Sequence, residues 1–469
     1  MTTSVAPKPA LQPAGTPNPS RTSTPSLSNL AAAAGANRNR AVDFYRAVAM
    51  GAVALGHWAA IAITVDAGGN LVSGNALEQA PSLAAMSWLF QVMPLFFVVG
   101  GFSSAMSLDA HNRRAGKPQD WVAARLRRML APTAVLATTW LALLAAGSVL
   151  GVGSLVATGA VAAAIPLWFL ANYTVDTAIA PYLLPRFRRN PGLVAGLGVG
   201  LFLALEAIRF AGVPYLPQIN WILGWLLFQM AGFAWRDGLL PTGRALFGAA
   251  AGLWVLAVAA VTVGPYPVSM VPFPGIGDLS PTHPPSLALM LFGSAYSATA
   301  LVAAPAISRW LARPSSAKAW SAVVAANSVA MSVYLWHFTA AVAAGAVLYG
   351  LGLLPTAAVG TAAWWVQKLP LIALSSLVLI AIVAVVARFE QRALLAPRVP
   401  WRGGAASMMG LAAAVSIAIK LWTNGSVPAV VAGAVAVVAA RHLALGTSAR
   451  AEHAVDVQAE DRADVETAV

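Results

Sequence analysis

The sequence predicts an all-α, polytopic transmembrane helical bundle, and three observations support this fold class. Of its 469 residues, 59% are hydrophobic and only 10% are charged, whereas a soluble domain carries about 25% charged residues. Apolar runs recur along the chain, each near the roughly 20 residues that one membrane-spanning helix needs. Basic residues are concentrated in alternate breaks between these runs. A single large water-soluble domain is therefore excluded.

The composition predicts four segments. Residues 1–40 are rich in proline, serine and threonine, so we expect a disordered cytoplasmic tail. Residues 41–395 are expected to form the main membrane domain, and residues 396–447 to add further membrane helices. Residues 448–469 are acidic and are expected to form a second disordered tail.

We interpret about 12 apolar runs as spans, with about 10 spans plus a re-entrant pair as the alternative. Pro166 is expected to kink or break the fourth run, because proline removes a helical hydrogen bond. The runs lie near residues 42–63, 83–107, 129–150, 155–181, 193–211, 219–235, 244–263, 285–306, 325–349, 364–387, 405–421 and 427–445.

The positions of the charges predict the orientation in the membrane. With the N-terminus in the cytoplasm, nearly all of the 29 Lys and Arg residues fall on the cytoplasmic side, as the positive-inside rule requires. The exceptions are Arg46 inside the first span and Arg209, Lys368 and Lys420 near the opposite face. The net charge of +13 therefore reports topology. We expect the lipid bilayer as a partner and expect no nucleic acid.

The sequence contains no cysteine. This excludes disulfides, zinc–thiolate sites and an acyl-cysteine intermediate within the chain. No metal site is predicted.

Three ionisable side chains lie in the first span, within the run AVDFYRAVAMGAVALGHW. At about 100° per residue, Asp43, Arg46 and His57 share one stripe of the helix, with Arg46 and His57 about 16 Å apart along the axis. Ionisable groups inside a span are candidates for function. The alternative is an Asp43–Arg46 pair and a histidine that only packs against a neighbouring helix. The residues alone leave both possibilities open.

An arginine cluster follows the second span, in the run WVAARLRRMLAP. Arg125 and Arg128 lie one turn apart, with Arg127 beside them, at the expected cytoplasmic mouth of a helix. Such a cluster is suited to binding phosphate groups. Spacing alone favours ordinary positive-inside charge.

Three further features are ambiguous. His337, within SVYLWHF, lies in a span and either faces the same cleft or packs between helices. Glu206 and Arg209 are expected to pair with each other. The outer break from Gly264 to Pro284, which contains Asp278 and His283, either covers an outward-facing cleft or is a rigid connector.

Several motifs together resemble the acyltransferase-3 family of integral membrane O-acyltransferases. Arg46 and His57 match its R-x10-H signature, and Arg125 and Arg128 match its RxxR motif. The other runs that carry the resemblance are MPLFFVVGGF (93–102), PLWFL (166–170), VYLWH (333–337) and PPSL (284–287), the last similar to actinobacterial members.

The resemblance covers roughly residues 40–390 and implies a core of about ten helices, so residues 405–445 look like an added pair. It also implies a bacterial inner-membrane enzyme that transfers an acyl group, acetyl in most cases, from acyl-CoA to a hydroxyl. The acceptor would be a carbohydrate, a glycolipid or a secreted metabolite.

By the same resemblance, each candidate residue has an expected role. His57 would act on the acceptor or the acyl group, Arg46 would help to orient the donor, and Asp43 would set the orientation of Arg46. Direct transfer and an acyl-histidine intermediate both stay open. The remaining candidates are Arg125, Arg127 and Arg128 for the coenzyme phosphates and Trp168, His337 and Asp278 for the substrate.

Two other function classes remain as alternatives. A multi-span transporter or exporter of a sugar or metabolite would also place charged groups in a central cleft. A scaffold protein would give the charged stripe of the first span no purpose. The sequence gives no oligomeric state.

Overall fold

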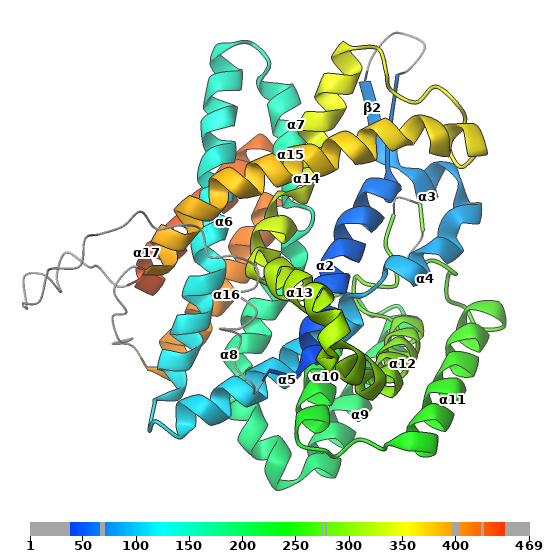
Figure 1. Ribbon diagram of the computed structural model, residues 1–469, viewed down its shortest axis with the longest axis vertical. Coiled ribbons are helices and arrows are strands. Elements are labelled where there is room, and N and C mark those ends of the chain that lie inside the picture. The colour runs from blue at the N-terminus through cyan, green and yellow to red at the C-terminus, as the bar shows by residue number, and fades with distance from the viewer. Residues whose placement is uncertain are drawn as a thin grey trace, which may run out of the picture.

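A computed structural model describes residues 38–65, 71–273, 275–276, 279–395, 404–423 and 426–445. Within these residues nearly all elements are helices, which confirms the predicted all-α class (Figure 1). The expected tails, apart from residues 38–40, and the candidate Asp278 lie outside the described residues. The elements are α2 (Arg40–Ala60), β1 (Ile61–Val65), β2 (Leu71–Asn75), α3 (Ala76–Gln79), η1 (Pro81–Met86), α4 (Ser87–Phe90), α5 (Met93–Asn112), α6 (Pro118–Val149), α7 (Gly153–Ala164), α8 (Leu167–Arg189), α9 (Pro191–Phe210), η2 (Leu216–Ile219), α10 (Asn220–Arg236), α11 (Gly243–Thr262), α12 (Leu287–Ala312), η3 (Pro314–Ser316), α13 (Ala317–Ser328), α14 (Ala330–Gly350), α15 (Ala362–Leu395), α16 (Ala405–Trp422) and α17 (Val427–Leu445).

Each predicted span overlaps a helix or a pair of helices. Seven helices in the described part of the chain are long and apolar enough to cross a membrane. The pair α7 and α8, bent by 43°, would make an eighth span. The predicted break at Pro166 is confirmed, because α7 ends at Ala164 and α8 begins at Leu167. The chain is thus a multi-pass membrane protein, and the count of about 12 spans stays a prediction.

The structure adds elements that the apolar runs do not predict. A β-hairpin follows α2 directly, with Ile61 of β1 opposite Asn75 of β2. Its first strand is the β-branched run IAITV, which favours an extended backbone. The short helix α13 lies between α12 and α14. The hairpin matters for the site because it fixes the direction in which the chain leaves α2.

The centre of the bundle contains a very close contact between α5 and α10. A Cβ atom at Gly101 would collide with the carbonyl oxygen of Gln229, and one at Gly232 with that of Val98. Only glycine permits this approach of two backbones, which is the usual way helices associate in membranes. The contact fixes α5 beside α10 and thereby positions the polar face of α5 toward α2.

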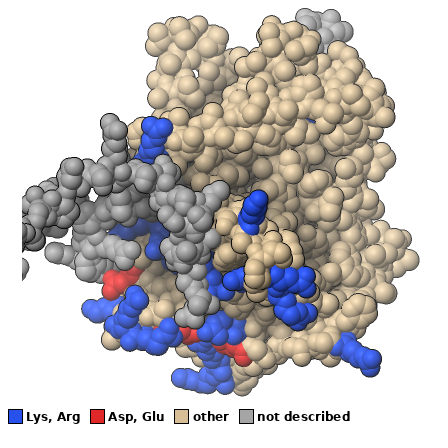
Figure 2. Space-filling view, viewed as in Figure 1, with Lys and Arg blue, Asp and Glu red and all other residues tan. Residues whose placement is uncertain are grey.

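Most of the visible Lys and Arg side chains gather at one end of the bundle, which we call the charged end (Figure 2). Arg188 joins three helices there, with its guanidinium 2.6 Å from the Asp109 carboxylate and 2.6 Å from that of Asp237. These ion pairs hold the ends of α5, α8 and α10 together. The sequence predicts that the charged end faces the cytoplasm.

The loop between α11 and α12 lies at the opposite end and is firmly attached. The predicted pairing of Glu206 with Arg209 is confirmed at 3.7 Å. Arg209 also donates a hydrogen bond to the Ser280 carbonyl (3.1 Å), and Glu206 accepts one from the Tyr266 hydroxyl (2.8 Å). These contacts attach the described part of the loop to α9, and its His283 also lines a cavity described below.

Candidate functional site

The N-terminal turn of α2 is held by capping and by charge. The side chain of Asn39 accepts a hydrogen bond from the Val42 amide, which satisfies one of the free amides at the helix start. The buried Asp43 lies 2.9 Å from Arg38 and 3.9 Å from Arg46, which are guanidinium-to-carboxylate distances. The predicted Asp43–Arg46 contact thus exists, and the shorter ion pair is made with Arg38.

Arg46 is fixed toward α5. Its guanidinium donates a hydrogen bond of 2.7 Å to the hydroxyl of Ser103. That hydroxyl in turn donates to the Val99 carbonyl at 2.9 Å. The side chain of Arg46 remains 29% exposed, so its charge is oriented and accessible.

The cations of α6 lie next to Arg46. Arg125 is half-buried, and its guanidinium lies 4.9 Å from the centroid of the Trp121 ring. It is close enough to Arg46 and Arg128 to interact with them electrostatically. No carboxylate of the described residues forms an ion pair with Arg125 or Arg128. The structure therefore brings two predicted groups together, the arginine of α2 and the arginine pair of α6, with Arg127 on the same helix.

A pair of histidines lies at the other end of α2. His57, in the last turn, has its Nδ1 2.8 Å from Nε2 of the fully buried His337 of α14. The two rings lie 7° from parallel with centroids 5.1 Å apart, so they are nearly coplanar and meet edge to edge through this hydrogen bond. The indole of Trp58 donates a hydrogen bond of 2.9 Å to the backbone carbonyl of His337, which holds α2 and α14 in register.

The hydrogen bonds assign the tautomers of this pair. Nδ1 of His337 lies 2.7 Å from the carbonyl oxygen of Tyr334, which can only accept a hydrogen bond. His337 therefore carries its proton on Nδ1, and its Nε2 accepts the Nδ1–H of His57. In the neutral pair, Nε2 of His57 is then left with a lone pair. This is the arrangement of a base whose ring is oriented by a second group.

Lys368 of α15 supports the same end of α2, and the sequence analysis placed it only near the outer face. Its ammonium group donates to the carbonyl of Ala59 at 2.7 Å and also to that of Ile61. It lies 4.1 Å from the centroid of the Trp364 ring, and the residue is only 1% exposed. Lysine satisfies free carbonyls at a helix C-terminus and complements its partial negative charge. The sequence could have identified Lys368 as a candidate for the site, because an ionisable residue within an apolar span is a candidate for function.

Trp168 lies apart from the histidine pair. The rings of Phe169 and Tyr334 pack between Trp168 and His337, with centroids 5.5 Å apart. Trp168 instead packs against His283, 6.1 Å between centroids, and lines a cavity of about 600 Å³. Of the predicted substrate residues, His337 thus joins His57, and Trp168 does not.

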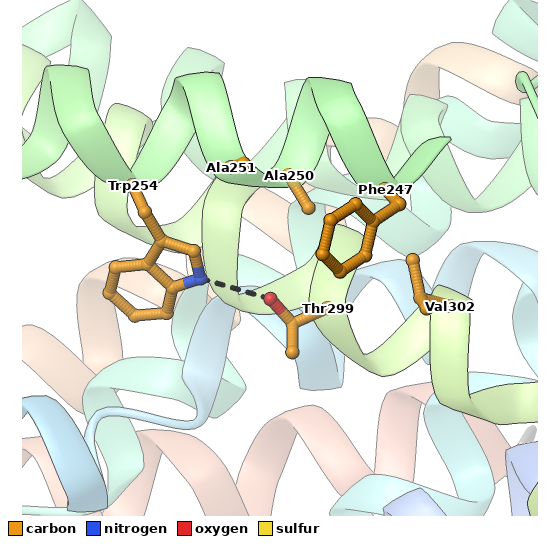
Figure 3. Close-up of a pocket in the computed structure, with 6 residues that line it drawn as sticks. All are labelled: Phe247, Ala250, Ala251, Trp254, Thr299 and Val302. Atoms are coloured by element: carbon orange, nitrogen blue, oxygen red, sulfur yellow. Dashed lines mark hydrogen bonds between the residues drawn. The ribbon is translucent and has the colours of Figure 1, made fainter. Parts of the chain in front are cut away.

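A second cavity, of about 260 Å³, lies between α11 and α12 (Figure 3). Its lining is apolar except for Trp254 and Thr299, and these two satisfy each other through a hydrogen bond of 3.0 Å. This cavity offers no group for chemistry. Among the described residues no cluster of His, Asp and Glu is arranged to hold a metal ion.

The fold and the site define a class of protein: a helical membrane protein with a hydrogen-bonded histidine pair, His57 and His337, and two arginines, Arg125 and Arg128, that form no ion pair with a carboxylate of the described residues. Residues 39–389 match the acyltransferase domain family, so the chain belongs to the acyltransferase-3 family and is a membrane acyltransferase acting on groups other than aminoacyl groups. The predicted family is confirmed, while the actinobacterial subtype stays a prediction. Neither the curated proteins nor the solved structures contain a match. The match includes the histidine pair, Arg46, Arg125 and Arg128, and it excludes α16 and α17.

Proposed function

We propose that this acyltransferase moves an acyl group, acetyl in the simplest case, from acyl-CoA to a hydroxyl of a carbohydrate, a glycolipid or a secreted metabolite. The bacterial inner membrane would be the site of the reaction. The observation that carries this proposal is the free Nε2 of His57, oriented by the hydrogen bond from His57 to His337 and from His337 to the Tyr334 carbonyl.

In the proposed reaction His57 is the general base. Nε2 removes the proton of the acceptor hydroxyl as its oxygen attacks the thioester carbonyl. The C–S bond then breaks, and the leaving thiolate of CoA receives the proton from His57. General-base assistance of this kind contributes about 10²- to 10⁴-fold to a rate.

The arginines of α2 and α6 supply the proposed donor site. Arg125 and Arg128 have no carboxylate partner among the described residues, so their charge is available to the phosphates of acyl-CoA. Arg46 adds a third cation beside them. Eleven residues of helix separate Arg46 from His57, about 16 Å, a length for the extended pantetheine arm to bridge. The phosphates would then lie toward the charged end and the thioester toward the histidines.

Two routes fit this arrangement, direct attack by the acceptor and transfer through an acyl-histidine. They differ in one observable. After mixing with acyl-CoA and without an acceptor, only the second route adds one acyl mass to the intact protein. A His57→Ala variant should never carry that mass.

The experiment that tests the function compares wild type, a deletion strain and a His57→Ala strain. Mass spectrometry of envelope glycans, lipids and secreted metabolites should show one acyl mass increment that is missing from the last two strains. His111→Ala is the matched control, because the ring of His111 lies at the charged end, where its Nε2 is 2.9 Å from the Lys117 carbonyl oxygen. Retained acylation in the His57→Ala strain, with normal protein levels in the membrane, would refute the proposal. Lost flux of an unacylated substrate would then favour the transporter.

A further inference from the structure

The cavity of about 600 Å³ lies where the first turns of α8 and α10 meet the last turns of α16, the helices labelled in Figure 1. Trp168 and Ala171 of α8 form one wall, and Trp221 forms another from the first turn of α10. His283, in the loop before α12, also lines the cavity. Residues of the last turns of α16, including Lys420, form the remaining wall.

The α16 wall is an addition to the family domain. The family match ends at residue 389, and α16 begins at Ala405. Trp422 and Ile419 are fully buried, so α16 packs tightly against the bundle. The cavity therefore exists only because this chain continues beyond the matched domain.

The cavity contains one unpaired cation. The ammonium of Lys420 lies 4.9 Å from the centroid of the Trp221 ring, and no carboxylate of the described residues pairs with it. The indole N–H of Trp221 is buried without a hydrogen-bond partner. This N–H is therefore available to donate to a ligand in the cavity.

His283 adds a neutral donor to the same cavity. Burial, and then the nearby positive charge of Lys420, lower the pKa of His283 to about 4. The imidazole is therefore uncharged at pH 7. Its Nδ1 lies 2.9 Å from the Thr282 hydroxyl. When that hydroxyl donates to Nδ1, Nε2 carries the proton and can donate to a ligand.

These groups suit an anionic amphiphile. The ammonium of Lys420 and the N–H groups of Trp221 and His283 can together bind a phosphate. The aromatic rings of the cavity can pack against a lipid headgroup or the face of a sugar. Ile417, Ile419 and Leu421 line the same cavity and suit an apolar chain. We propose that the cavity formed by Trp168, Trp221, His283 and α16 binds a phosphate-bearing amphiphile, with the phosphate on Lys420.

This binding site is separate from the histidine pair. Neither His57 nor His337 lines the cavity, and Trp168 reaches His337 only through the successive ring contacts of Phe169 and Tyr334. The proposal therefore needs no acyl transfer, and binding is measurable without an acyl donor.

The test is native mass spectrometry of the full chain in detergent, titrated with dioctanoyl phosphatidylglycerol. The same titration with glucose 1-phosphate, which has the phosphate and no acyl chain, tests whether the amphiphile is required. We expect one tightly bound phosphatidylglycerol, weaker binding of glucose 1-phosphate, and a loss of about tenfold or more in affinity for Lys420→Gln. Lys420→Arg should retain most of the affinity.

Lys318→Gln is the matched control, because it removes one exposed lysine from the other side of the molecule. Equal affinities of wild type and Lys420→Gln would overturn the proposal, as would an equal loss in Lys318→Gln. Equally tight binding of glucose 1-phosphate would overturn the need for an amphiphile. Thermal melts of both variants check that each remains folded.

Discussion

Replacing His337 by phenylalanine is expected to lower kcat for acyl transfer by about 10²- to 10⁴-fold, the full value of general-base assistance. Phenylalanine keeps a planar ring at the edge of His57, where the planes of the two histidine rings lie 7° from parallel. It removes Nε2, the acceptor that lies 2.8 Å from Nδ1 of His57. The base then loses the partner that fixes both its tautomer and its orientation.

The expected loss corresponds to about 3 to 5 kcal/mol of activation free energy. The upper part of the range applies if the wrong tautomer of His57 dominates, because its Nε2 then carries a proton and cannot act as the base. A buried N–H left without an acceptor also costs about 1 to 3 kcal/mol of folding stability. The contact from Trp58 survives, since it is made to the backbone carbonyl of residue 337.

The assay is steady-state transfer from labelled acyl-CoA to the acceptor, with a thermal melt of each variant. His337→Gln is the informative partner variant, because its amide oxygen can again accept the Nδ1–H of His57. We expect its kcat to lie between wild type and His337→Phe, with KM for acyl-CoA unchanged in both. A His337→Phe enzyme within about threefold of wild-type kcat would refute the assigned hydrogen-bond chain, since general-base help is worth far more.

Two further predictions concern the supporting cations. Arg125→Ala combined with Arg128→Ala should raise KM for acyl-CoA by about tenfold or more, because charge-assisted hydrogen bonds are worth about 1.5–3 kcal/mol each. An equal rise in KM for the acceptor would contradict the role of these arginines in binding the donor. Lys368→Met leaves the carbonyls of Ala59 and Ile61 without their donor, so we expect a lower Tm and a reduced kcat with KM values little changed. Lys368→Arg keeps a side chain that can donate to these carbonyls, so it should recover part of the lost kcat. An unchanged kcat in Lys368→Met would show that Lys368 does not position His57.

The sequence determined the fold class and the chemistry of the first helix. Hydropathy alone predicts a membrane bundle, because the bilayer imposes one apolar length on every span. The stripe of Asp43, Arg46 and His57 follows from helical periodicity, which is a local property. The break at Pro166 is local as well, and the structure confirms it.

The tertiary structure decided what each of these side chains meets. His57 hydrogen-bonds to His337, which is 280 residues away in the sequence, and Arg46 hydrogen-bonds to Ser103. No periodicity links residues on different helices, because such contacts depend on how α2, α5 and α14 are arranged in space. The tautomer of His57 depends on that arrangement and so could not be read from the sequence.

Three basic residues show the same difference between what the sequence predicts and what the tertiary structure decides. The sequence identifies Arg209, Lys368 and Lys420 as exceptions to the positive-inside rule, and it predicts a partner for Arg209 alone, which is Glu206. In the structure Arg209 fastens the loop before α12, Lys368 caps α2, and Lys420 faces a cavity. The positions of charges in the sequence show which of them are unusual, but only packing decides their partners. A buried or oriented charge is stabilised by groups that folding brings from distant segments of the chain.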